Sequence, residues 1–118
     1  MKEFILIFRD SAKSGYQPSP AEMQEVMTQW MDWMGSIAAQ GKLANPGNRL
    51  SSQGAKTVKP GHVVTDGPYT EIKEFINGYI IVKTETLDEA VELAGGCPIL
   101  NVGGNVEVRT IVTMDDNS

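Results

Sequence analysis

The side chains best suited to acid–base chemistry fall close together in the middle of the chain. His62 is the only histidine, and imidazole is the side chain whose ordinary pKa suits proton transfer near neutral pH. Asp66 follows shortly after it, directly before a rigid Gly-Pro pair. We therefore treat Asp66 and His62 as candidate catalytic residues. The structural alternative is an ordinary strand-edge histidine and an aspartate that closes a turn through its own backbone.

The residues after the Gly-Pro pair supply most of the candidate ligand-binding groups. Tyr69 offers a hydroxyl donor, and Glu71 and Lys73 form either the rim of a pocket or a solvated charged face. Arg109 is suited to hold an anionic substrate, or to pair with one of these carboxylates. Trp30 completes the set, since an aromatic side chain on an apolar helix stripe either packs in the core or lines a pocket beneath the helix.

Composition excludes several classes of function. One histidine and one cysteine are too few for the usual zinc sites, and no phosphate-binding glycine motif is present. A net charge of −5 with scattered Lys and Arg argues against direct nucleic-acid binding. The apolar run at residues 4–8 is too short for a signal peptide or a membrane span. We expect no metal, no nucleotide cofactor, no nucleic-acid or membrane partner, and a cytoplasmic protein.

The single cysteine is expected to be structural. One cysteine cannot form an internal disulfide and fits a reducing compartment. Cys97 also follows the expected end of a helix, where the negative end of the helix dipole disfavours a thiolate.

Two capping motifs predict the helices that position these groups. Ser19-Pro20-Ala21-Glu22 has capping-box spacing with proline at the first helical position, and apolar residues then recur at helical spacing as far as Gly41. Thr86-Leu87-Asp88-Glu89 repeats the pattern and predicts a shorter helix that ends at Gly95-Gly96. Strands are predicted at 3–9, 79–83 and 105–113.

Turn signals divide the middle of the chain. Asn45-Pro46-Gly47 predicts a turn between two short strands, 43–44 and 49–50. Lys59-Pro60-Gly61 predicts a hairpin, and Asn77-Gly78 predicts a two-residue hairpin turn. Residues 69–76 match no single element.

This order of elements predicts one α+β domain over residues 1–113, with a frayed tail at 114–118. The expected fold is a ferredoxin-like split βαβ arrangement, with an antiparallel sheet and both helices on one face. The strands at 4–8 and 79–82 are apolar on both faces, although two helices can cover only one. A second copy of the chain is the simplest cover, so we expect a homodimer.

The chain resembles the DGPF proteins of the YCII-related family. The resemblance rests on Asp66-Gly67-Pro68-Tyr69 with the Glu71–Glu74 stretch, on Cys97-Pro98 and on Val106-Glu107-Val108-Arg109, and it spans nearly the whole sequence. It implies a dimeric α+β barrel. Tyr69 stands where that family usually has Phe. Trp30 lies near the position of a first-helix histidine that the family is proposed to use with an aspartate, so that His–Asp mechanism does not carry over.

Two functions follow as alternatives. The first is a small-molecule-binding protein, with or without enzymatic activity, that uses acid–base side chains without metal or nucleotide. The second is a non-catalytic regulatory or interaction module linked to transcription, since some members of the family that it resembles accompany sigma factors. A binding protein needs a concave pocket where polar groups converge, whereas a module needs a flat patch with its charges pointing outward.

Overall fold

The computed structural model describes residues 1–11, 19–51, 54–67 and 74–113. Its elements, in chain order, are β1 (Lys2–Ser11), α1 (Pro20–Ala39), β2 (Leu43–Arg49), β3 (Lys56–Lys59), β4 (Val63–Asp66), β5 (Glu74–Thr84), α2 (Leu87–Ala94), the short 3-10 helix η1 (Pro98–Val102) and β6 (Asn105–Thr110).

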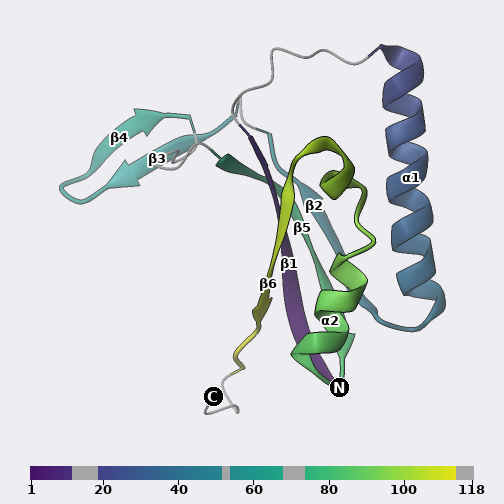
Figure 1. The fold of residues 1–118 in the computed structure, drawn as a ribbon. Coiled ribbons are helices and arrows are strands. Elements are labelled where there is room, and N and C mark those ends of the chain that lie inside the picture. The colour runs from purple at the N-terminus through teal and green to yellow at the C-terminus, as the bar shows by residue number, and fades with distance from the viewer. Residues whose placement is uncertain (12–18, 52–53, 68–73, 114–118) are drawn as a thin grey trace.

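Four of the strands form an antiparallel sheet in the order β2-β5-β1-β6. β5 lies between β1 and β2, and β1 lies between β5 and β6, so each strand–helix–strand unit is split by a strand of the other unit. Both helices lie on one face of the sheet (Figure 1). The predicted ferredoxin-like α+β architecture is confirmed.

The capping box predicted at α1 is present, and at α2 one of the two capping-box hydrogen bonds is present. At α1 the hydroxyl of Ser19 accepts a hydrogen bond from the backbone N–H of Glu22 at 3.2 Å, and the Glu22 carboxylate accepts from the Ser19 N–H at 3.4 Å. At α2 the Thr86 hydroxyl accepts from the N–H of Glu89 at 3.2 Å. Each cap satisfies backbone donors that the first turn of a helix leaves free.

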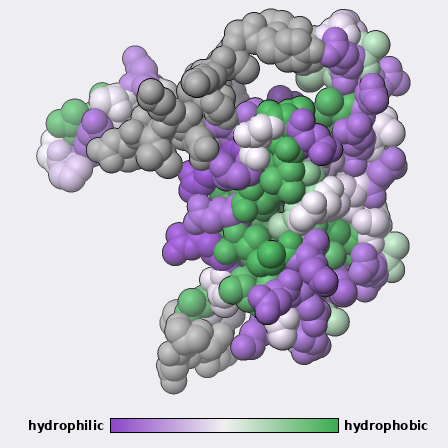
Figure 2. Space-filling view, viewed as in Figure 1, coloured by the Kyte–Doolittle hydropathy of each residue, from purple (hydrophilic) through white to green (hydrophobic). Residues whose placement is uncertain are grey.

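The core lies between the helices and the even-numbered side chains of the central strands. In β1 these are Phe4, Leu6 and Phe8, and in β5 they include Ile80 and Val82, all at most 4% exposed. They contact Trp33 and Ile37 of α1, the alanines of α2, and the segment that holds Cys97 and Ile99. Figure 2 shows the complementary pattern, with hydrophilic residues along the outer side of α1 and hydrophobic ones gathered in the middle of the molecule.

The predicted turn at Asn45-Pro46-Gly47 is wrong, because these residues lie inside the continuous strand β2. The Asn45 side-chain oxygen accepts from the N–H of Gly47 at 2.7 Å, and the register against β5 shifts on either side of Asn45. Gly47 has a φ of 64°, and a Cβ there would overlap the carbonyl oxygen of Tyr79. The Pro-Gly pair therefore forms an irregularity within a strand, where the glycine permits close approach of the backbone.

The predicted hairpin turn at Asn77-Gly78 is also wrong. Both residues lie within β5, where Gly78 pairs with Phe8 on one side and with Arg49 on the other. Asn77 is the extra residue at the point where the β1–β5 register shifts. A Cβ at Gly78 would lie 2.7 Å from the carbonyl oxygen of Asn48, so this glycine also serves close backbone approach.

The hairpin around Lys59-Pro60-Gly61 is confirmed as β3 and β4, and it projects away from the main sheet (Figure 1). His62 lies in its turn with a φ of 61°, and β4 begins one residue later.

The face of the sheet opposite the helices is apolar along its middle. Ile5 pairs with Ile81 and Ile7 pairs with Tyr79 in neighbouring positions of β1 and β5, and all four are half-buried. No helix of the described residues lies over this face (Figure 1).

Gly47→Ala should destabilise the protein by about 2–5 kcal/mol, because it adds both left-handed backbone strain and overlap with the next strand. Gly41→Ala is the control: its φ is 71°, but an added Cβ meets nothing within 4 Å. It should therefore cost only the strain, about 1–2 kcal/mol. Urea unfolding of both variants measures the difference, and equal losses would contradict this account of β2.

Candidate functional site

A cavity of about 890 Å³ lies between α1 and the sheet. α1 residues between Met23 and Met34 form one wall, parts of β1, β2 and β5 form the floor, and η1 also contributes to the lining. Its volume is in the range of cavities that hold small organic molecules.

The α1 wall is rich in methionine. Met23, Met27, Met31 and Met34 all line the cavity, and Met27 and Met31 are more than half exposed. Methionine side chains are flexible and polarisable, and they make favourable contacts with aromatic rings. This wall can adapt to the shape of an apolar molecule.

The two tryptophans of α1 have different surroundings. Trp33 is buried, and its indole N–H donates to the carbonyl oxygen of Leu93 at 3.0 Å. Trp30 is half-buried and lines the cavity, with its ring edge-to-face against Phe8 at 4.9 Å and Trp33 at 5.7 Å between centroids. Its indole N–H has no hydrogen-bond acceptor among the described residues. Trp30 thus packs against the core on one side and faces the cavity on the other.

Polar groups border the cavity at the sheet. Asn77 donates to a carboxylate oxygen of Asp10 at 3.4 Å, and Arg49 pairs with Gly78 at the end of β2. None of these three residues is among the site residues predicted from the sequence. Asp10 continues the even-numbered, helix-facing positions of β1, a signal that could have identified it. Arg49 and Asn77 could not be identified because the sequence predicts turns at Asn45-Pro46-Gly47 and Asn77-Gly78, where the structure has strands.

The predicted catalytic pair lies on the hairpin, away from this cavity. His62 is exposed in the hairpin turn. The Asp66 carboxylate is 92% exposed and forms an ion pair with the Lys56 ammonium at 2.8 Å. Both Asp66 and Lys56 border a separate shallow hollow at the base of the hairpin. The catalytic roles of Asp66 and His62 stay predictions.

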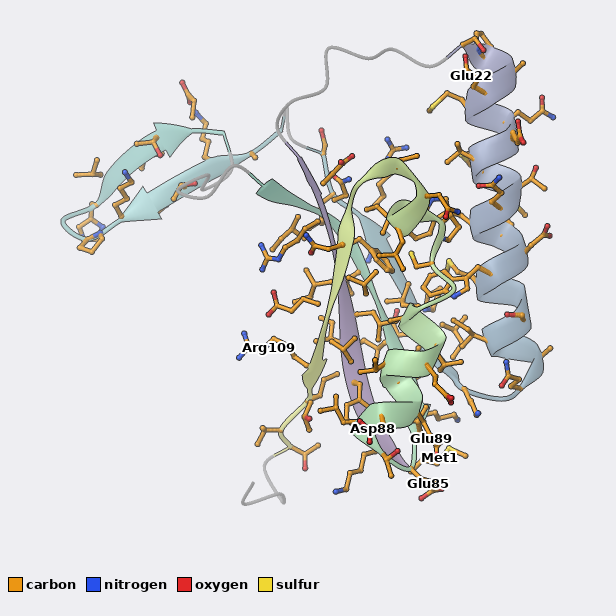
Figure 3. All side chains as sticks on the ribbon, viewed as in Figure 1. Met1, Glu22, Glu85, Asp88, Glu89 and Arg109 are labelled. Carbon is orange, nitrogen blue, oxygen red and sulfur yellow. The ribbon has the colours of Figure 1, made fainter. Side chains whose placement is uncertain are left out.

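Arg109 lies on β6 and points away from the helices (Figure 3). Glu107 lies near it at 3.7 Å and pairs more closely with Arg9 at 2.9 Å. Tyr69, Glu71 and Lys73 fall outside the described residues. Of the predicted set that the structure describes, Trp30 alone lines the large cavity, and the other members are not brought together.

Cys97 is buried and has little nucleophilic character. Burial raises the pKa of its thiol from 9.0 to about 11, against a smaller lowering effect from a backbone hydrogen bond at Ile99. The thiol is therefore protonated at neutral pH. The expectation of an inert cysteine was reasoned from the helix dipole, but desolvation is the larger physical cause.

Within residues 1–11, 19–51, 54–67 and 74–113, no three His, Cys, Asp or Glu side chains gather as metal ligands do. No helix in the described part of the chain has the length and apolar character required to cross a bilayer.

Comparison with known proteins gives one clear result. The family model of the YCII-related domain matches residues 3–115, which is nearly the whole chain. No curated protein matches the sequence.

The raised pKa of Cys97 predicts a loss of stability at alkaline pH. The unfolded thiol ionises near pH 9, whereas the folded thiol keeps its proton until about pH 11. The stabilisation is therefore complete below pH 9 and lost as pH rises to 11, by at most about 3 kcal/mol. Urea unfolding across this range should show a shallower decline for Cys97→Ala. The same pH dependence in the wild type and in Cys97→Ala would contradict the attribution of this stability loss to the Cys97 thiol.

Proposed function

The chain belongs to the YCII-related domain family, and on that premise we propose that it is a homodimer that binds a small, largely apolar molecule between α1 and the sheet. Within the family we group it with the DGPF proteins, because Asp66-Gly67-Pro68-Tyr69 differs from that signature only at its last residue.

The observation that carries the binding proposal is the cavity of about 890 Å³. The hollow is open to solvent on one side and has the size of a small-molecule site. The Trp30 ring and the methionine wall supply apolar contacts, while Asp10, Asn77 and Arg49 supply a few polar groups at the sheet. Such a mixture of apolar walls and few polar groups is typical of small-molecule sites.

The dimer proposal is supported by the open face of the sheet. Ile5, Ile7, Tyr79 and Ile81 form a continuous apolar strip on adjacent strands. Charges of both signs border it, including Glu107 with Arg9 and Arg109. A surface with an apolar centre and mixed charges at its edge suits a two-fold contact with its own copy.

The regulatory alternative has one observation in its favour. The β3–β4 hairpin projects from the sheet, and Val58, Val63 and Val64 on it are each more than half exposed (Figure 1). His62 and Asp66 on the same hairpin also face solvent. Binding of a partner protein to this hairpin would support the interaction-module alternative. Acid–base catalysis by His62 and Asp66 stays a separate proposal, which the cavity does not require.

We expect N-phenylnaphthylamine, an uncharged aromatic probe, to bind in the cavity with a rise in its own fluorescence and quenching of tryptophan emission. Val26→Glu places a charge on the cavity wall and should weaken this binding about tenfold or more. Thr28→Glu is the matched control, since Thr28 is exposed on α1 and does not line the cavity. If both variants bound the probe like the wild type, the cavity would not be the binding site.

Light scattering coupled to size exclusion should give about twice the chain mass of 12.8 kDa. Ile7→Glu buries a carboxylate in the proposed interface and should shift the protein toward the monomer. Val102→Glu, at an exposed position of η1, is the control and should stay dimeric. A monomeric wild-type protein at micromolar concentration would refute the dimer proposal.

A further inference from the structure

Arg49 is placed to act on a ligand in the cavity. It is the last residue of β2 and pairs with Gly78 of β5. Paired residues in a sheet project to the same face, and Gly78 shares its face with the buried Ile80. Arg49 therefore lies on the helix side of the sheet, and its pairing partner has no side chain to compete for the space.

Arg49 carries a charge that no acidic group of the described residues neutralises. The ion pairs in the described part of the chain join Arg9 and Arg109 to Glu107, and Lys56 to Asp66. The Arg49 guanidinium takes part in no ion pair or side-chain hydrogen bond with the described residues. A guanidinium stays charged at all ordinary pH values and presents its donors in a planar fork that fits carboxylate, sulfonate or phosphate oxygens. The position thus favours an anionic group at this end of the cavity.

Asp10 is the acidic residue in the cavity lining, and its backbone lies on a different strand from Arg49. Asp10 lies beyond Phe8 on β1, and Phe8 is separated from Arg49 by two strand spacings, about 10 Å. This backbone separation and the dissolved salt both reduce the repulsion between Asp10 and an anion at Arg49. The Asp10 carboxylate is itself hydrogen-bonded by Asn77.

The remaining cavity residues indicate the chemistry of the part of the ligand that does not carry the charge, here called its body. The Trp30 ring and the methionine side chains favour a flat, aromatic molecule. The indole N–H of Trp30, which has no acceptor in the described part of the chain, is available to an oxygen or nitrogen on that body. The buried Trp33 has no such donor to offer, since its N–H is bonded to Leu93.

We propose that the ligand is an aromatic or similarly flat organic acid, whose anionic group binds Arg49 and whose body lies between Trp30 and the methionine wall. This inference rests on the proposed function and narrows it from apolar small molecules in general to anionic ones.

The experiment compares two probes that share one ring system. Anilinonaphthalene sulfonate is the anionic counterpart of the uncharged N-phenylnaphthylamine. The wild-type protein should bind the sulfonate about tenfold more tightly than the uncharged probe, as expected for a charge-assisted hydrogen bond. Arg49→Gln should remove that preference, because it lowers the affinity for the sulfonate about tenfold more than the affinity for N-phenylnaphthylamine. Arg109→Gln removes the same charge from the other side of the sheet and should leave both affinities unchanged.

The possible outcomes distinguish failure of this inference from failure of the proposed small-molecule binding. Binding of N-phenylnaphthylamine without a preference for the sulfonate would overturn the anionic ligand and leave the cavity as a binding site. A preference that survives in Arg49→Gln, or that is lost equally in Arg109→Gln, would overturn the role of Arg49. Failure of both probes to bind would overturn the proposed function together with this inference.

Discussion

The contact among Phe8, Trp30 and Trp33 determines where the core ends and the cavity begins. The three rings pack edge-to-face, with centroids 4.9 to 5.8 Å apart, and they join α1 to the central strand β1. On the C-terminal side of this contact, Ile37 is buried and the helix lies close to the sheet. On its N-terminal side the helix residues line open space instead. One aromatic cluster therefore supports the fold and also borders the cavity.

The parts of the fold that depend on local chemistry were predictable from sequence. The capping box at Ser19 involves residues three positions apart, so the sequence contains everything needed to recognise it. The signals at Asn45-Pro46-Gly47 and Asn77-Gly78 are equally local, but there the local preference is overridden. Each segment pairs with a strand distant in sequence, and its glycine permits close backbone approach instead of a reversal of the chain.

The site was less predictable than the fold for the same reason. Trp30 could be identified because helical periodicity places it on the inner stripe of α1. Arg49 could not, because its position depends on its register against Gly78, which the sequence does not reveal. His62 and Asp66 were singled out for their chemical types, yet the hairpin holds them away from the large cavity. The residue type indicates which chemistry a side chain can perform, whereas the pairing of the strands determines where that side chain lies.

The methionine wall has a consequence for selectivity. Each methionine has three rotatable bonds, and ordering such a side chain against a ligand costs up to about 2 kcal/mol of conformational entropy. Four flexible methionine side chains can adapt to ligands of many shapes. The entropy lost when they become ordered offsets part of the favourable contact energy with each ligand. Under the proposed function, ligands with apolar parts of similar size should therefore differ little in their affinity for the cavity. The protein would tolerate a range of related compounds and accept modest affinity for each, as a broad-specificity binder does.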